Sequence, residues 1–395
     1  MSLAQLLTLD TDTIRFLLVM SVVVGAAVYA RWFLAAGGTL TGGYLVLLVL
    51  LGEWELILAM LCVTWISYWV VKVVMTRHFA LPKVWLFCGF VVISAVSMAV
   101  ITMAFRSLGT IDLPFGTQFA LISGSYITPG LIAYDLAHQG LRPTMIGMTA
   151  VFGGTLLVAI PVLMVANVLH PESSLRYVPG YGNIPPGLFW LATLASVFIC
   201  VALRLSFAAR AGGFIGPLFI TEMLSWQAMV TITSAALVAY VITRHVNRVI
   251  LLTPRQRFQV SLVMGMMCAW TGLYWGARVG WMPALAANSY ALEPLLAVGL
   301  LAAEMGRRGS SVLRTLSATA VAVAFITLVL YAATSDAPQS LISTPLLLLG
   351  VPAVLLLPAI LDLRAAWHTS VSAGRGVVAA WTQLESSRGV DGRGS

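Results

Sequence analysis

Long apolar runs, separated by short polar stretches, dominate the pattern of residues along this chain. A membrane-spanning helix needs about 20 mainly apolar residues, and most of these runs approach that length. They predict thirteen spans, near residues 13–30, 37–52, 55–72, 84–104, 114–134, 144–168, 187–203, 211–225, 227–243, 258–276, 288–305, 315–333 and 341–362. The pattern therefore predicts an all-α, polytopic transmembrane helical bundle.

Two of the predicted spans, 37–52 and 211–225, are short and begin at glycine pairs. Short segments of this kind are typical of broken or re-entrant helices, provided that protein or water covers their free backbone groups. The pattern leaves open whether either segment crosses the membrane completely. The glycines at the two openings are Gly37, Gly38, Gly212 and Gly213.

Composition agrees with a membrane protein. Of the 395 residues, 60% are hydrophobic and 9% are charged, whereas a soluble domain has about 25% charged residues. This excludes a soluble enzyme, a disordered chain and an ordinary nucleic-acid-binding domain. The four cysteines lie in apolar runs without a CxxC spacing, which favours buried thiols over a zinc site or a disulfide framework. The stretch before the first run is acidic, so we predict that it is not a cleaved signal peptide.

The net charge of +8 indicates membrane orientation. With the predicted spans, 18 of the 22 Lys and Arg residues fall on one side, which we assign to the cytoplasm. The other four are Arg15, Arg106, Arg176 and Arg278. We therefore predict a multi-pass protein of the bacterial inner membrane, with its N-terminus outside and its C-terminus in the cytoplasm.

Two parts of the chain resemble each other at an offset that drifts from 174 to 169 residues. The clearest match joins the segments 130–140 and 299–309, which share the pattern G-L-[IL]-A-x-[DE]-x3-[QR]-G. Six spans in each part predict two parallel repeats, related by a pseudo-twofold axis along the membrane normal. The predicted units are a first transmembrane repeat (13–168), an external linker (169–186), a second repeat (187–333), an extra span (341–362) and a cytoplasmic tail (363–395).

At these motifs the chain resembles a tandem duplication of the PgsC/CapC membrane subunit of bacterial poly-gamma-glutamate (capsule) synthase. That family carries a Gly-rich element ending in Y-L, a Y-x3-K stretch and a late P-G-L-I-A motif followed by Q-G. The first half contains all three, in the residues Gly42, Gly43, Tyr44, Leu45, Tyr68, Lys72, Pro129, Gly130, Gln139 and Gly140.

The resemblance covers 15–170 well and 187–333 more weakly. In the second half, Pro217, Val298 and Arg308 replace the residues that the family motifs carry. This departure puts equal function of the two halves in doubt. The motif positions of the second half are Gly212, Gly213, Pro217, Gly299, Glu304, Arg308 and Gly309.

The chain contains no nucleotide-binding lysine loop, no metal-ligand spacing of histidines and no nucleophile elbow, so we predict no catalytic residue, cofactor or metal of its own. The resemblance implies that a separate cytoplasmic ligase uses ATP and metal for amide ligation. This chain would anchor that ligase beside further synthase subunits in the lipid, and pass the anionic polymer. Nucleic acid is not an expected partner, and oligomerisation is left open. The alternatives are a secondary transporter for a small anionic solute and a non-transporting membrane scaffold.

Cations at the ends of spans are the candidates for a polymer path. Lys72 and Arg244 lie at the inner ends of equivalent spans, where they either snorkel towards the lipid headgroups or steer an anionic chain. Further candidates are Arg204 and Arg210 at the inner mouth, and Arg106 and Arg278 at an outer exit.

Glycines and acids complete the set of candidates. The backbone N–H groups around Gly37, Gly38, Gly42 and Gly43 either face an anionic ligand or allow close helix packing. Asp135 and Glu304 occupy matched positions, where each either pairs with a nearby arginine or contacts the ligase or the polymer. Glu222 has no counterpart in the first half, and we expect it to pair with a basic residue or to cap a helix.

Overall fold

The described structure consists of helices. A computed structural model describes residues 11–35, 41–76, 83–107, 119–169, 184, 186–207, 209–223, 225–250, 252–282, 292–307 and 311–334. Within these ranges every regular element is a helix, which confirms the predicted all-α class. The predicted span 341–362, the tail 363–395 and most of the linker 169–186 lie outside the described residues.

The first half of the chain forms one group of helices. They are α2 (Thr11–Trp32), α3 (Thr41–Leu51), α4 (Trp54–Tyr68), which continues as the π-helix η1 (Trp69–Met75), α6 (Lys83–Ser107), α7 (Phe119–Gln139) and α8 (Leu141–Leu169). The second half forms another group. It contains the short 3-10 turn η2 (Pro186–Leu188), α9 (Phe189–Phe207), α10 (Ile215–Glu222), α11 (Trp226–Val249), α12 (Pro254–Arg278), α14 (Glu293–Met305) and α15 (Val312–Ala333).

Seven of the described helices are long and apolar enough to cross a membrane. They cover Asp12–Trp32, Trp54–Met75, Leu86–Ala104, Leu141–Val165, Trp226–Val249, Pro254–Arg278 and Val312–Ala333. By contrast, α3 has 11 residues and α10 has 8. At about 1.5 Å per residue, neither reaches across a hydrocarbon core of about 30 Å. The segments near the two glycine pairs therefore form short helices, while the total of thirteen spans stays a prediction.

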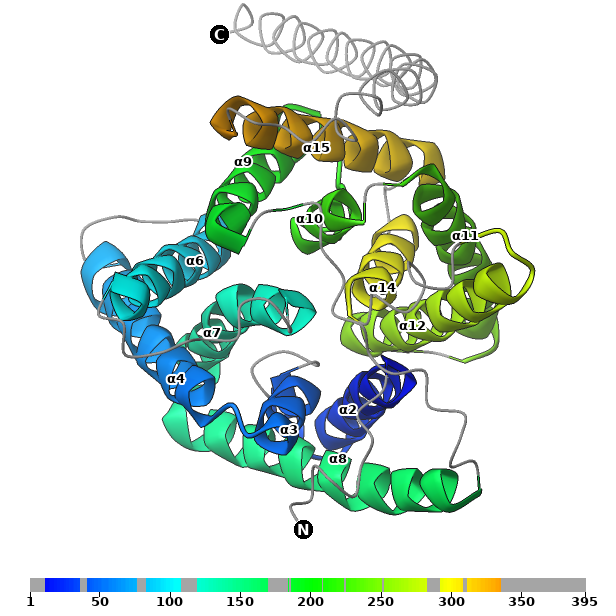
Figure 1. Cartoon of the computed structure of the whole chain (residues 1–395), viewed down its shortest axis with the longest axis horizontal. Coiled ribbons are helices and arrows are strands. Elements are labelled where there is room, and N and C mark those ends of the chain that lie inside the picture. Colours follow the sequence, from blue (N-terminus) through cyan, green and yellow to red (C-terminus); the bar gives the residue numbers. More distant parts are fainter. Residues whose placement is uncertain are drawn as a thin grey trace, which may run out of the picture.

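Two groups of helices meet along two junctions (Figure 1). In the first group α2 packs against α3 and α8, and α7 packs against α4 and α6. In the second group α9 packs against α10 and α15, and α14 packs against α11 and α12. The groups touch where α2 packs against α12 and where α6 packs against α9. Residues far apart in the sequence therefore come together between the groups.

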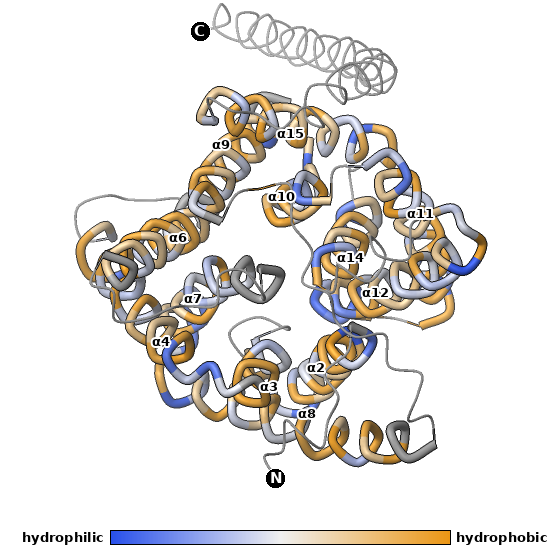
Figure 2. Tube along the Cα trace, viewed as in Figure 1, coloured by the Kyte–Doolittle hydropathy of each residue, from blue (hydrophilic) through white to orange (hydrophobic). Residues whose placement is uncertain are grey.

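The helices are apolar on their outer faces as well as in the core. Figure 2 shows hydrophobic residues along most of each helix, with hydrophilic residues mainly towards the ends. Large apolar side chains such as Leu157, Phe198 and Val241 are exposed on the surface of the chain. An apolar exposed surface of this extent marks a membrane-contacting face. The fold is thus that of an integral membrane protein.

Local sequence explains where several helices begin. Thr253 caps α12: its hydroxyl accepts a hydrogen bond from the Gln256 N–H, and the Gln256 side chain accepts one from the Thr253 N–H. Ser225 and Ser311 cap α11 and α15 in the simpler way, through one hydroxyl each. These caps satisfy N–H groups that the first turn of a helix leaves without partners.

Candidate functional site

A cavity of about 610 Å³ lies between the two groups of helices. Its walls come from α6, α7, α9, α10, α12 and α14, together with the segment that leads into α10. Most of the wall is apolar, and this part consists of Phe87, Cys88, Leu131, Tyr134, Val197, Cys200, Val201, Ala211, Phe214, Ile215, Phe258, Leu262, Leu296 and Leu300. The size is in the range of small-molecule sites, about 300 to 1,000 Å³.

The polar part of the cavity is rich in arginine. Four arginines line it, one at the end of α9, one before α10, one at the start of α12 and one just after α14. They are Arg204, Arg210, Arg255 and Arg307. The acids that line the cavity are Asp135 on α7 and Glu304 on α14. The lining side chains therefore carry an excess of positive charge.

Glu304 holds two of these arginines. Its carboxylate lies 2.9 Å from the Arg307 guanidinium and 3.6 Å from that of Arg210. Glu304 is 14% exposed, so the pairs are only partly screened by solvent. Glu304 therefore pairs with arginine, as one of its two interpretations predicted. Arg210 is one of its two partners.

Arg204 and Arg255 are the more available cations of the cavity. Within the described part of the chain, the Arg204 side chain is exposed and makes no hydrogen bond or ion pair. The Arg255 guanidinium lies 4.0 Å from the centre of the Tyr29 ring, in a cation–π contact, and makes no ion pair within the described residues. A planar guanidinium suits two-pronged binding of a carboxylate. These two side chains can therefore receive an anionic group.

The turn before α10 forms part of the cavity wall. Gly212 and Gly213 both have φ of +69°, in the left-handed region that other residues avoid. Gly213 lines the cavity, and its carbonyl accepts a hydrogen bond from the Cys200 thiol at 3.5 Å. The Gly212-Gly213 pair thus turns the backbone before the helix starts. Pro217 follows inside α10, where it is buried.

The described glycines of the Gly-rich element in the first half serve packing. The Gly43 N–H donates a hydrogen bond to the Ser21 hydroxyl at 2.6 Å. A Cβ on Gly42 would lie 2.4 Å from a methyl group of Val151. Tyr44 is 2% exposed, and its ring would be 2.8 Å from a Cβ on Gly124. Of the two interpretations of this element, its described part fits close helix packing. Gly37 and Gly38 lie outside the described residues.

Two motif glycines lie at equivalent helix crossings. A Cβ on Gly130 would lie 2.8 Å from the Phe90 carbonyl oxygen, where α7 crosses α6. A Cβ on Gly299 would lie 3.0 Å from the Leu262 carbonyl oxygen, where α14 crosses α12. Both glycines allow close approach of two helix backbones. Pro129 lies beside the first crossing, inside α7.

Gln139 connects the end of α7 to the segment before α3. Its side-chain oxygen accepts a hydrogen bond from the Ala35 N–H at 3.1 Å, and its amide nitrogen donates one to the Ala35 carbonyl. Gly140 follows with φ of +88°, which separates α7 from α8. The equivalent Arg308 and Gly309 lie outside the described residues.

The remaining predicted path residues do not line this cavity. Lys72 is exposed on η1, and Arg244 is exposed on α11. Arg278 donates a hydrogen bond to the Tyr274 hydroxyl at 2.6 Å, at the exposed end of α12. Arg106 lies on α6, and its side chain is outside the described part of the structure. The structure therefore brings together Arg204, Arg210, Asp135, Gly213 and Glu304.

Sequence reasoning missed other charged positions. Arg255 and Gln259 were not among the candidate residues, yet both line the cavity. Their i,i+4 spacing, which places both on one face of α12, is the signal that could have found them. Among the residues that the structure describes, Glu222 pairs with no basic residue: it is 1% exposed, and one of its carboxylate oxygens has no hydrogen-bond partner. Within the described ranges, no cluster of His, Cys, Asp or Glu suits a metal ion.

The fold and the cavity define an integral membrane protein with an arginine-lined site between two helix groups. A family model described as "Capsule biosynthesis CapC" matches residues 195–316. This match confirms the resemblance to the CapC family and supports a capsule synthase subunit of the CapC/PgsC type. It falls in the half where we expected the weaker resemblance, and it contains all four cavity arginines. No curated protein and no solved structure matches the chain.

Proposed function

We propose that this protein is the membrane subunit of a poly-gamma-glutamate synthase complex and that it contacts the anionic polymer in the arginine-lined cavity. The observation that carries the proposal is the pair Arg204 and Arg255. Both line a cavity in which arginines outnumber acidic residues. Each glutamate unit of the polymer carries a free carboxylate, and guanidinium groups bind carboxylates in a planar geometry. The apolar rest of the wall suits passage, because conduction needs weak contacts rather than one tight site.

The packing of the helices supports a tandem duplication, which belongs to the same proposal. The neighbours of each helix in the first group are matched in the second: α2 has α3 and α8, as α9 has α10 and α15. The central helices α7 and α14 each pack against four partners, α3, α4, α6 and α8 for α7 and α10, α11, α12 and α15 for α14. Each also carries a motif glycine at a backbone crossing. The two junctions between the groups, α2 with α12 and α6 with α9, also correspond. We infer two parallel repeats around a pseudo-twofold axis.

The predicted orientation puts the cavity arginines near the cytoplasmic face. Arg204 and Arg210 follow α9, Arg255 begins α12, and Arg307 follows α14, all at ends that the charge distribution assigns to the inside. A polymer made by a cytoplasmic ligase would enter there. Anchoring of that ligase on the inner loops, and location in the bacterial inner membrane, belong to the same proposal.

The experiment measures polymer binding by the purified full-length protein in lipid nanodiscs. Labelled poly-gamma-glutamate is titrated against wild type, Arg204→Gln/Arg255→Gln and the control Lys72→Gln/Arg244→Gln. Loss of two charge contacts, worth about 1.4 kcal/mol together, weakens binding about tenfold. The control keeps the cavity intact and should bind as wild type does. Equal loss in both double variants would contradict the cavity assignment and favour the exposed pair.

A secondary transporter for a small anionic solute is the second candidate. A cavity of about 610 Å³ between two helix groups is the observation that favours it. The two candidates differ in their partners. Isolation of the protein from its native membrane with an ATP-dependent amide ligase would support the synthase. Uptake of a labelled anion by vesicles that contain only this protein would support the transporter.

A further inference from the structure

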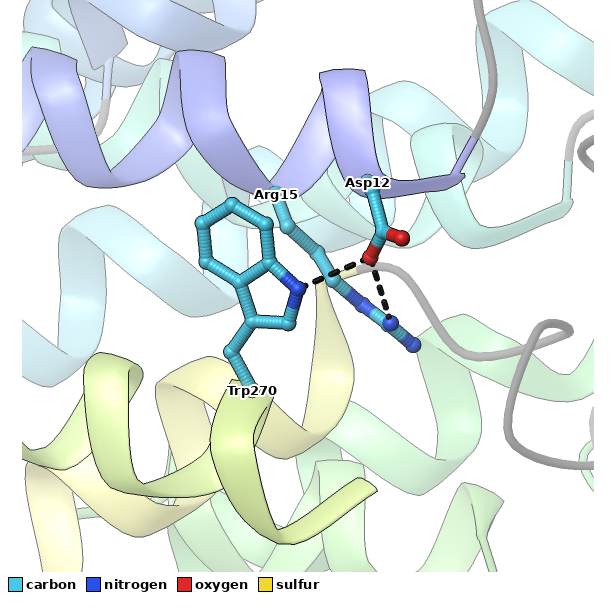
Figure 3. A network of polar contacts seen from close by, with 3 residues as sticks. All are labelled: Asp12, Arg15 and Trp270. Atoms are coloured by element: carbon cyan, nitrogen blue, oxygen red, sulfur yellow. Dashed lines mark hydrogen bonds and ion pairs between the residues drawn. The ribbon is translucent and has the colours of Figure 1, made fainter. Parts of the chain in front are cut away.

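A second group of charged side chains lies where α2, α10, α12 and α14 come together. We call it the buried charge cluster, and it consists of Asp12, Arg15, Glu222, Trp270 and Glu293. Arg15 lies 3.2 Å from one carboxylate oxygen of Asp12, and the Trp270 N–H donates to the same oxygen at 2.8 Å (Figure 3). Arg15 is 3% exposed and is thus an almost fully buried cation.

Two buried glutamates complete the cluster. Glu293 and Glu222 are each 1% exposed. One carboxylate oxygen of Glu293 accepts a hydrogen bond from the Leu292 N–H at 3.2 Å, and Arg15 lies within electrostatic range of Glu293. One carboxylate oxygen of Glu222 has no hydrogen-bond partner within the described structure. Glu222 and Glu293 lie within electrostatic range of each other, on the packed helices α10 and α14. The two acids therefore have unequal surroundings.

The charges of this cluster do not balance. It contains three carboxyl groups and one arginine, and Asp12 already pairs with that arginine. The helices packed against α10 and α14 carry their arginines near their ends. These are Arg204 of α9, Arg244 and Arg248 of α11, Arg255, Arg257 and Arg278 of α12, and Arg314 of α15. A buried charge without compensation costs several kcal/mol, so two ionised glutamates side by side are strongly disfavoured.

A bound proton resolves this imbalance. Within the described residues, no group of three or more acids, cysteines or histidines has the arrangement of a metal site. A carboxyl group that takes up a proton from solution becomes neutral without any further ligand, electron transfer or broken bond. The neutral form also gains an O–H donor. The chemistry of the cluster therefore favours a proton over a metal ion.

We propose that Glu222 and Glu293 form a proton-binding pair in which Glu222 carries the proton and Glu293 stays ionised against Arg15. This inference goes beyond the proposed function and does not depend on it. The pair lies on the same two helices that reach the arginine-lined cavity, since Ile215 of α10 and Glu304 of α14 line it.

The test is infrared spectroscopy of the purified full-length protein in nanodiscs at neutral pH. Wild type should show the carbonyl stretching band of a protonated carboxyl group, shifted by exchange into D2O. Glu222→Gln should lose that band, because the variant removes the group that carries the proton. Glu293→Gln should keep it, as should the control Glu55→Gln, whose side chain is exposed on α4. A band that persists in folded Glu222→Gln, or is absent from wild type, would overturn the proposal.

A second measurement on wild type guards against misfolding of the variants. A hydrophobic carbodiimide reacts with protonated carboxyl groups in apolar surroundings, and peptide mass spectrometry locates the adduct. Glu222 should be modified, while the exposed Glu55 should not. Modification of Glu293 instead of Glu222 would contradict the assignment of the proton. Since neither measurement uses polymer, failure here would leave the polymer-binding proposal standing, and the reverse also holds.

Discussion

The arginine-lined cavity and the buried charge cluster differ in the sign of their excess charge and in its exposure to solvent. In the cavity arginines outnumber acids, and Arg204 at its edge is exposed. In the cluster acids outnumber the arginine, and Arg15 is 3% exposed. Water solvates an exposed excess of positive charge until an anion binds. A buried excess of negative charge has no such solvation and must be neutralised within the protein. The comparison indicates that the solvent exposure of a charged side chain separates the two roles. Exposed charges are available to bind a ligand, and buried charges act on the stability of the fold.

Removal of the buried arginine should have the largest effect. Arg15→Gln removes a buried cation from beside the half-buried Asp12 and the fully buried Glu293. This should lower the free energy of unfolding by about 3 kcal/mol. Unfolding of the purified protein in mixed micelles measures the change. Arg278→Gln is the matched control, because Arg278 is exposed and its loss should cost less than about 0.5 kcal/mol. Equal losses in the two variants would show that the cluster is not sealed.

Ionic strength should affect the two regions differently, and this is the second largest effect that we expect. Raising ionic strength from about 0.1 M to about 1 M shortens the screening length from about 10 Å to about 3 Å. Polymer affinity at the cavity should then fall severalfold. The stability difference between wild type and Arg15→Gln should change less, since the Arg15 guanidinium is buried and salt screens a buried charge weakly. Affinity that ignores salt would argue against cationic binding in the cavity.

The tryptophan of the cluster offers a smaller test. Trp270→Phe keeps a large apolar ring but removes the hydrogen bond to Asp12, so unfolding should become easier by about 1 kcal/mol. Trp275→Phe, on the exposed side of the same helix, should change stability little. If both substitutions have the same effect, Asp12 is held by Arg15 alone.

Glu304→Gln should give the smallest change in stability and an opposite change in binding. Its pairs with Arg210 and Arg307 are partly exposed, so their loss should cost less than about 1 kcal/mol. Both arginines then become available, and polymer affinity should rise about twofold to fivefold, a gain of less than about 1 kcal/mol. Glu55→Gln serves as the control for a lost acid. Weaker polymer binding by Glu304→Gln would mean that the acid orients the arginines for binding.

Much of the fold follows from the sequence because membrane helices must satisfy their backbone internally. The apolar runs near 55–72, 144–168 and 315–333 correspond to α4, α8 and α15. The boundaries at α12 were set too late, because the polar first turn with Thr253 and Gln256 interrupts the apolar run while it caps the helix. Hydropathy alone does not register such a turn.

The site was predictable only in part. Arg204, Arg210 and Glu304 were singled out by their places at the ends of spans, and they do line the cavity. Lys72 and Arg244 have equally suggestive places in the sequence, yet both are exposed away from it. Which helix face a terminal cation occupies depends on packing between distant helices, and local sequence does not contain that information. The cluster around Arg15 was missed for the same reason, since Trp270 lies 258 residues from Asp12.

The spacing of Asp12 and Arg15 has a consequence for the order of events during translation. The two residues are three apart in α2, so their pair can form as soon as the first helical turn exists. Trp270 and Glu293 leave the ribosome far later. An unpaired arginine in a membrane helix disfavours insertion, even where it lies near the helix end as Arg15 does. The pair of Asp12 and Arg15 therefore lets the first helix enter the bilayer as a nearly neutral segment. Trp270 and Glu293 pack around this pair in place of lipid after the second half of the chain has been inserted.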